Sequence, residues 1–236
     1  GYAMLQKILK RKFGDYVIEF CIVLLGITIA FWLSNLGEKA KERRLEKVYL
    51  QQLNEDITED INVMMKAISF NNIKITSLNT GVNYIYKNSK SLSTDSVEKY
   101  TLQCGNYNFF YPTSNSYVTL QQSGDLKIIR DQELKKKLIV LYQSYEIIKT
   151  EQLNIVQALD DNLYPLLYES YDMITEEITD SEFFKSTKCT NFVAFTLNST
   201  SQMNDLYKYS KRLAEATSDW IINDLGELDA TQDNPD

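Results

Sequence analysis

The feature that most constrains the fold is a long apolar run near the N-terminus, residues 16–35, YVIEFCIVLLGITIAFWLSN. As a helix, these 20 residues extend for about 30 Å, which matches the hydrocarbon core of a bilayer. Tyr16 and Trp32 lie near its ends, where amphipathic rings favour the headgroup region. The run therefore predicts a transmembrane helix. A buried core helix and a cleaved signal peptide are the two alternatives, although a signal peptide has a shorter apolar part.

Basic residues flank this run on both sides and bear on its orientation. Four precede it and five follow it: Lys7, Lys10, Arg11 and Lys12, then Lys39, Lys41, Arg43, Arg44 and Lys47. The near balance favours neither side, but a long C-terminal domain can be translocated regardless of its charge. We therefore expect the chain to span the inner membrane of a bacterium. Its N-terminus should lie in the cytoplasm and its C-terminal domain on the extracytoplasmic side. Residues 1–15 are expected to form a basic tail, with Met4 as the native start after residues 1–3.

Four residues of the run are candidates for contact with the membrane or a partner: Glu19, Gly26, Ala30 and Asn35. A carboxylate at the centre of a span costs roughly 2.5–3.5 kcal/mol. Glu19 lies near the end of the run, so it can pair at the interface, contact another helix or line an ion path. Gly26 and Ala30 form a small-xxx-small pair, a weak signal for helix dimerisation.

The rest of the chain predicts long helices, because 236 residues include only 8 glycines and 3 prolines. Neither residue type occurs between positions 38 and 80, so the membrane helix is expected to continue into a stalk helix. Apolar residues recur there about every 3.8 positions, which favours packing in a bundle over a long coiled coil. They are Leu45, Tyr49, Leu53, Ile57, Ile61, Met64 and Ile68.

Turn and capping signals divide the remainder. A short helix is expected to end at Gly124, and Asp131 is expected to cap a long helix that begins at Gln132. That helix should reach about Ile174 with a kink near Pro165, and a last helix should begin at Ser201. The predicted fold class is all-α: one N-terminal transmembrane helix, a long stalk helix and an antiparallel helical bundle. The bundle domain should cover residues 36–227, followed by a flexible acidic tail at residues 228–236.

Several kinds of chemistry are disfavoured. The chain has no histidine, so it cannot supply a Ser-His-Asp triad or a histidine-ligated metal site. It also lacks the phosphate-binding and hydrolase motifs, so we expect no enzyme activity, cofactor or metal. A net charge of −7 disfavours nucleic-acid binding. Acidic clusters at Glu55, Asp56, Glu59 and Asp60, and at Asp160 and Asp161, are expected to be solvated faces.

Tyrosines and cysteines leave alternatives open. Tyr142, Tyr145, Tyr164, Tyr168 and Tyr171 can line a groove for an apolar or sugar-like ligand, or form a core edge with hydroxyls facing water. Cys104 and Cys189 are expected in irregular segments, either paired as a disulfide in an extracytoplasmic domain or buried as free thiols. Cys21 lies at lipid depth and is expected to be inert.

Two blocks resemble a family of uncharacterised bacterial single-pass membrane proteins with an N-terminal span and a helical bundle. They are EFCIVLLGITIAFWLSNLGEKAKERRLEKVYLQQLNEDI and TLQQSGDLKIIRDQELKKKLIVLYQSYE, together less than a third of the chain. The resemblance implies the same architecture but no activity, and it draws attention to Glu19, Asn35 and the turn at Gly124.

These observations favour a non-enzymatic, membrane-anchored bundle that acts as a scaffold, a sensor or an accessory subunit. Its expected partners are the lipid bilayer and either a protein partner or a second copy of the chain. The alternative is a homo-oligomeric pore with Glu19 facing its axis.

Overall fold

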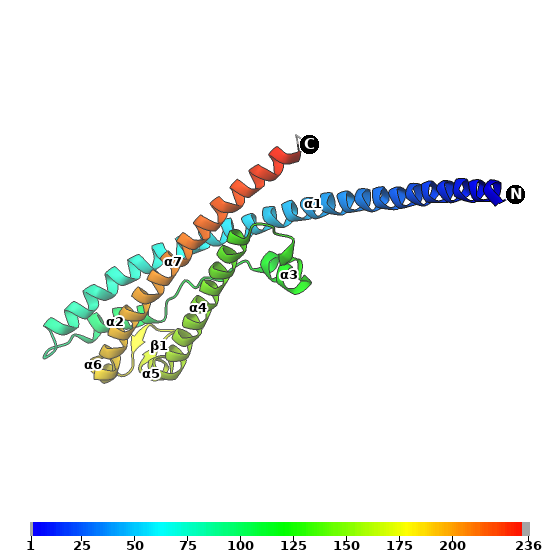
Figure 1. Cartoon of the computed structure of the whole chain (residues 1–236). Coiled ribbons are helices and arrows are strands. Elements are labelled where there is room, and N and C mark those ends of the chain that lie inside the picture. The colour runs from blue at the N-terminus through cyan, green and yellow to red at the C-terminus, as the bar shows by residue number, and fades with distance from the viewer. Residues whose placement is uncertain (1, 233–236) are drawn as a thin grey trace. The chain divides into compact units, whose positions relative to one another are not determined.

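The computed structural model describes the backbone of residues 2–232 and the side chains of residues 18–230. The chain divides into two compact units, Gly1–Val48 and Tyr49–Asp236. Helix α1 (Tyr2–Lys87) contributes to both (Figure 1). The expected boundary of the bundle domain at residue 36 is therefore too early for the compact second unit.

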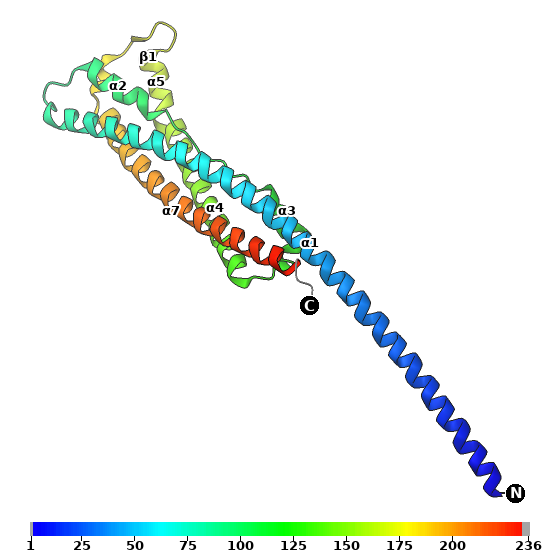
Figure 2. The same ribbon diagram turned by 90° about the horizontal axis from the view of Figure 1, so that it is seen from above.

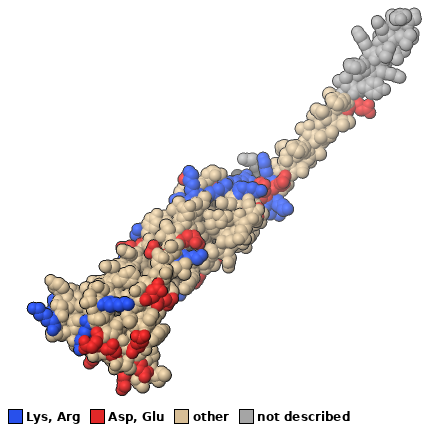
Figure 3. All heavy atoms as spheres, turned by 90° about the horizontal axis from the view of Figure 1, so that it is seen from below, with Lys and Arg blue, Asp and Glu red and all other residues tan. Residues whose placement is uncertain are grey.

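The first unit is part of a single helix. Between residues 18 and 36 its side chains are mainly large, apolar and exposed, and one candidate membrane span is found here. Figure 3 shows no basic side chain on the stretch next to the grey residues. The basic tail at residues 1–15 and the side chain of Tyr16 lie outside the described side chains.

The second unit is almost entirely helical, so the expectation of an all-α fold is confirmed. After α1, its elements are α2 (Thr94–Cys104), α3 (Asn115–Ser123), a 3₁₀ turn η1 (Asp125–Lys127), α4 (Gln132–Asn162), α5 (Tyr164–Ser170), β1 (Tyr171–Asp172), β2 (Glu177–Ile178), α6 (Ser181–Lys185) and α7 (Thr187–Gln232).

Three long helices, α1, α4 and α7, lie side by side in this unit (Figures 1 and 2). Side-chain hydrogen bonds fix their directions. Asn54 and Asn72 of α1 bond to Ser218 and Asn204 of α7 respectively, so these two helices are antiparallel. Helix α7 is also antiparallel to α4, because Asp131 and Gln152 bond to Trp220 and Tyr207.

It follows that α1 and α4 are parallel to each other, so the expected antiparallel order holds for α7 alone. Parallel neighbours need a connection that returns the chain to its starting end. The extended segment 105–114 provides it, running back from α2 to α3.

All three helices bury residues at alternating steps of three and four, a mean period of 3.5. On α1 the buried series is Leu50, Leu53, Ile57, Asp60, Met64, Ala67, Asn71, Lys74 and Leu78. On α4 it is Leu134, Leu138, Leu141, Tyr145, Ile148, Gln152, Ile155 and Leu159. On α7 it is Cys189, Val193, Thr196, Thr200, Met203, Tyr207, Ser210, Ala214, Thr217 and Ile221.

A period of 3.5 is that of a coiled-coil seam. The expected face of α1, with its spacing of 3.8, is wrong, because over the same stretch the helix buries Glu46, Leu50, Asp60 and Ala67 in place of Leu45, Tyr49, Ile61 and Ile68. Tyr49, Ile61 and Ile68, which were expected on the buried face, are half-buried beside it.

The C-terminal half differs most from expectation. Helix α4 ends at Asn162 instead of continuing to Ile174, and Pro165 lies in the first turn of α5. Strands β1 and β2 then form a small antiparallel hairpin in which Tyr171 pairs with Ile178. The last helix begins at Thr187, before the expected Ser201, because Asn198–Ser201 is helical. It extends to Gln232, so the tail is helical over residues 228–232, and residues 233–236 lie outside the described residues.

Candidate functional site

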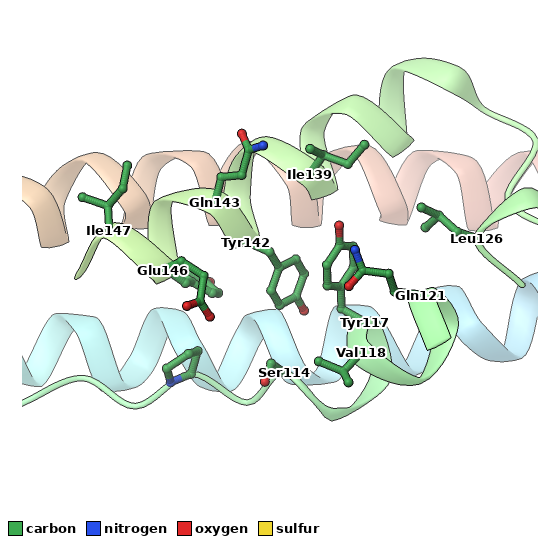
Figure 4. Close-up of a pocket in the computed structure, with 12 residues that line it drawn as sticks. Ser114, Tyr117, Val118, Gln121, Leu126, Ile139, Tyr142, Gln143, Glu146 and Ile147 are labelled. Carbon is green, nitrogen blue, oxygen red and sulfur yellow. The ribbon is translucent and has the colours of Figure 1, made fainter. Parts of the chain in front are cut away.

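The second unit has an open groove of about 680 Å³ between α3 and α4 (Figure 4). This volume falls in the range of roughly 300–1,000 Å³ that is typical of ligand sites. Segment 112–126 forms one wall and the outer face of α4 the other. The lining residues are Pro112, Ser114, Tyr117, Val118, Gln121, Leu126, Ile139, Tyr142, Gln143, Tyr145, Glu146 and Ile147.

Stacked aromatic rings form the base of this groove. The rings of Tyr117 and Tyr142 are parallel within 5°, with centroids 3.9 Å apart. Tyr145 meets Tyr142 edge-on at 5.4 Å, and Phe110 meets Tyr145 edge-on at 5.1 Å. Three aromatic contacts in series therefore connect the groove to the core of the bundle.

Two carboxylates of α1 hold the start of α3 and so position this wall. The Thr113 amide donates to Asp60 Oδ1 over 2.7 Å, and the Ser116 amide donates to Asp56 Oδ2 over 3.2 Å. The Ser116 amide belongs to the first turn, where amides lack partners within the helix and carry partial positive charge, so its contact with Asp56 is favourable. The contact with Asp60 pairs the Thr113 amide just before the helix. Gly124, with φ of 74°, ends α3 as expected.

The position of Asp60 corrects the expectation of a solvated acidic face. Its side chain is fully buried, and burial raises its pKa to about 6, against the lowering effect of the Thr113 amide. The neighbouring hydroxyl of Tyr145 also lowers the pKa of Asp60, and the hydroxyl of Tyr142 has no hydrogen-bond partner among the described residues. Glu55, Glu59, Asp160 and Asp161 are exposed, as expected, and Asp56 is half-buried.

A second groove, of about 480 Å³, lies between α4 and α7. Its walls are Ile147, Glu151 and Ile155 of α4 and a segment of α7, residues Ser199, Gln202, Met203, Asp205 and Leu206. Ile147 lines both grooves, so the two meet at this residue. We call this joined surface the α4 groove.

Lys74 forms a separate polar site inside the unit. Its ammonium donates to the carbonyl oxygens of Cys104, over 3.4 Å, and Asn106, over 2.5 Å. It also lies 3.3 Å from the centre of the Tyr107 ring. Burial lowers the pKa of Lys74 to about 7, and a small hollow of about 220 Å³ borders the side chain.

The expected membrane-contact residues lie on the first unit. Glu19, Gly26 and Ala30 are exposed and Asn35 is half-buried. A methyl group built on Gly26 would meet nothing within 4 Å. Their roles in membrane or partner contact stay predictions.

Cys104 and Cys189 are both buried and both free, which corresponds to the second of the two alternatives. Neither lies in an irregular segment: Cys104 ends α2, and Cys189 is in the first turn of α7. Cys189 Sγ lies 3.1 Å from the Thr101 hydroxyl, and Cys104 Sγ donates to the Tyr100 carbonyl. Burial raises the pKa of both thiols, that of Cys104 to about 11.

The tyrosines divide between the two interpretations. Tyr142 and Tyr145 line the groove between α3 and α4, but their hydroxyls are buried and do not face water. Tyr164 stacks on Tyr168 elsewhere, with centroids 6.0 Å apart. Tyr117 and Glu146 were not singled out in the sequence, because a lone aromatic residue and a lone acid carry no pattern.

No group of three or more Cys, Asp or Glu side chains suited to a metal occurs among residues 18–230. Comparisons of the chain with protein-family models, with curated proteins and with solved structures found no match. The resemblance to a family of single-pass membrane proteins therefore stays an expectation from the residues themselves.

Proposed function

We propose that this chain is a membrane-anchored, non-enzymatic binding protein, in which residues 18–36 lie in the bilayer and the bundle binds a protein partner. It would serve as a scaffold, a sensor or an accessory subunit of a membrane complex. One observation carries the anchoring. Twelve large apolar side chains between residues 18 and 36 are 44–68% exposed. They are Ile18, Phe20, Ile22, Val23, Leu24, Leu25, Ile27, Ile29, Phe31, Trp32, Leu33 and Leu36.

An apolar surface this continuous is rare on a soluble protein and needs a cover. Lipid supplies it without any further contact, because a helix satisfies its own backbone hydrogen bonds. We place the span in the bacterial inner membrane, with the N-terminus in the cytoplasm and the bundle outside.

Alkaline carbonate extraction of membranes tests the anchor. The full chain should stay in the pellet, and a Leu24→Lys, Ile27→Lys variant should move to the supernatant or fail to accumulate. The matched control is Ile73→Lys, which changes an apolar residue of the second unit that is 71% exposed. Extraction of the unaltered chain would contradict the proposal.

Labelling from outside the cell tests the orientation. Cys104 and Cys189 are buried, so the second unit offers little background to an impermeant maleimide. A cysteine introduced at exposed Ser91 should be labelled in intact spheroplasts. If it is labelled only after lysis, the bundle lies in the cytoplasm.

The partner role is supported by the α4 groove, which leaves Ile139 and Ile147 of α4 exposed beside stacked aromatic rings. A photo-crosslinking residue at Gln143, within the groove, should give a defined adduct in native membranes. The same residue at Gln157, exposed on α4 but outside both grooves, should not.

The homo-oligomeric pore is the second candidate, favoured by the exposed carboxylate of Glu19 among apolar side chains. Mass measurement in detergent decides between them. A monomer excludes the pore, and an oligomer whose bilayer conductance falls in Glu19→Gln supports it.

A further inference from the structure

We infer that the α4 groove binds a basic amphipathic helix of a protein partner. The inference rests on the proposed role of the bundle in partner binding, and it adds the secondary structure and the charge of the bound segment. It does not depend on the membrane anchor.

The first argument is the shape of the surface. Gln143, Ile147 and Glu151 follow one another at intervals of four residues and form one exposed ridge on α4, with Ile139 on the side of α3 and the buried Ile155 on the side of α7. Eight residues separate the ends of this ridge, which is about 12 Å along a helix axis. A partner helix can contact this ridge over about two turns, and helices dock into such grooves through side chains three and four residues apart.

The second argument is the apolar surface left uncovered. Ile139 is 39% exposed, Val118 37% and Ile147 53%, and all three line the groove between α3 and α4. Ile147 lies where the two grooves meet, so a helix along α4 would cover it. The stacked rings of Tyr117 and Tyr142 beneath these side chains give the surface a fixed shape.

The third argument is charge. The charged residues that line the two grooves are all acidic: Glu146, Glu151 and Asp205. The buried carboxylate of Asp60 and that of Asp56 lie behind the Tyr117 wall, at the start of α3. Lys149 and Lys208 approach Glu146 and Asp205 at 3.6 and 3.7 Å, but both pairs are exposed and weak. A partner with lysine or arginine beside its apolar face is therefore complementary.

The same charges argue against a second copy of the chain as the occupant. In a two-fold dimer through this surface, the acids of one copy would face those of the other, and like charges at an interface are costly. A basic partner helix meets the charge requirement and the apolar requirement together.

The test uses the full chain in detergent and two synthetic helical peptides of sixteen residues. Both carry leucine at positions that form one helix face; one carries lysine at the flanking positions and the other glutamate. We expect the lysine peptide to bind at least tenfold more tightly than the glutamate peptide, measured by fluorescence anisotropy. Equal affinities, or no binding of the lysine peptide, would overturn the inference.

Variants place the binding on the α4 groove. Ile147→Glu should weaken binding of the lysine peptide at least tenfold, because it puts a charge where both grooves meet. The matched control is Leu153→Glu, on the same helix, 61% exposed and outside both grooves, which should bind as the unaltered chain does. Equal losses in both variants, or none in Ile147→Glu, would show binding elsewhere and overturn the inference.

Charge reversal provides a second, independent readout. Glu146→Lys combined with Glu151→Lys should reverse the preference toward the glutamate peptide, and an unchanged preference would overturn the inference. Failure here leaves the proposed function intact if Gln143 still crosslinks to a partner in membranes. Loss of that adduct would instead remove the proposed function.

Discussion

The ammonium of Lys74 lies 3.3 Å from the centre of the Tyr107 ring and donates to two backbone carbonyls, without a carboxylate partner among its described contacts. A buried charge held only by dipoles and a ring face is costly in comparison with water. The low pKa of Lys74, about 7, expresses this cost.

This cost predicts a pH dependence of stability. Lys74 binds a proton in the unfolded chain up to about pH 10.5, but in the folded chain only up to about pH 7. Stability should therefore rise between pH 7 and 9, by at most about 1.4 kcal/mol per unit of pKa difference, because above pH 9 the raised pKa values of the Cys104 and Cys189 thiols act in the opposite direction. Urea denaturation of the full chain in detergent should show this rise, and Lys74→Met should abolish it. A rise of the same size in Lys74→Met would assign the effect to other groups.

Asp60 should make stability fall with rising pH, in a lower pH range than that of Lys74. Its pKa is 3.8 in the unfolded chain and about 6 in the folded chain, so the folded chain binds the extra proton between these values. The contribution of Asp60 to the free energy of unfolding is fully present below pH 4 and is lost as the pH rises through 6. It amounts to at most about 3 kcal/mol.

Asp60→Asn should remove that slope and make the chain more stable than the unaltered one at pH 7, as measured by urea denaturation. The Asn oxygen can still accept from the Thr113 amide. The control, Asp56→Asn, removes a carboxylate at a half-buried position one turn away and should keep the slope. A retained slope in Asp60→Asn would contradict the assignment.

Substitution of Gln152 should cause a large loss of stability. Its side chain accepts from the Phe110 amide over 2.9 Å, donates to the Phe110 carbonyl over 3.0 Å and accepts from the Tyr207 hydroxyl. Gln152→Leu leaves the Phe110 carbonyl without this donor and the Phe110 amide with only its longer contact to the Tyr207 hydroxyl, 3.4 Å away, so we expect a loss of about 2–4 kcal/mol in the free energy of unfolding. Gln157→Leu, at an exposed position of α4, should change it by less than about 0.5 kcal/mol. Equal effects would mean that the contacts with Phe110 contribute little.

Two helical glycines predict opposite effects of the same substitution. A methyl group on Gly81 would lie 2.5 Å from Tyr100 Cγ, whereas one on Gly226 would meet nothing within 4 Å. Gly81→Ala should therefore destabilise by about 1–3 kcal/mol through overpacking, and Gly226→Ala should stabilise by about 0.5–1 kcal/mol. Thermal denaturation followed by circular dichroism measures both, and stabilisation by Gly81→Ala would show that Tyr100 moves aside freely.

The features predictable from sequence were those with a local cause. The cap of α4 depends on Asp131, whose carboxylate accepts from the amides of Glu133 and Leu134, and Gly124 ends α3 in the conformation that glycine favours. Both follow from residues close in the chain. The apolar helix at residues 18–36 is equally local.

The features that were missed depend on distant contacts. The buried face of α1 is not defined by apolar spacing alone, because it includes the polar Asp60 and Lys74, whose partners are Thr113 and residues 104–107. The start of α7 was missed because Asn198–Ser201 reads as a loop, although Thr196 and Thr200 face the core and the Thr196 hydroxyl bonds within the helix. The groove between α3 and α4 was foreseen only as tyrosines on a helix, without Tyr117 opposite them.

The polar members of the α1 seam have a consequence for how the bundle finds its alignment. An apolar seam of period 3.5 looks nearly the same after a slide of seven residues, which would move Ile57 to the place of Met64. The same slide would move Asp60 to the place of Ala67 and away from the Thr113 amide. A slide in the other direction would move Lys74 to the place of Ala67 and away from the Cys104 and Asn106 carbonyls. A slipped bundle would thus hold two charges without partners, and only one axial setting of the helix satisfies both.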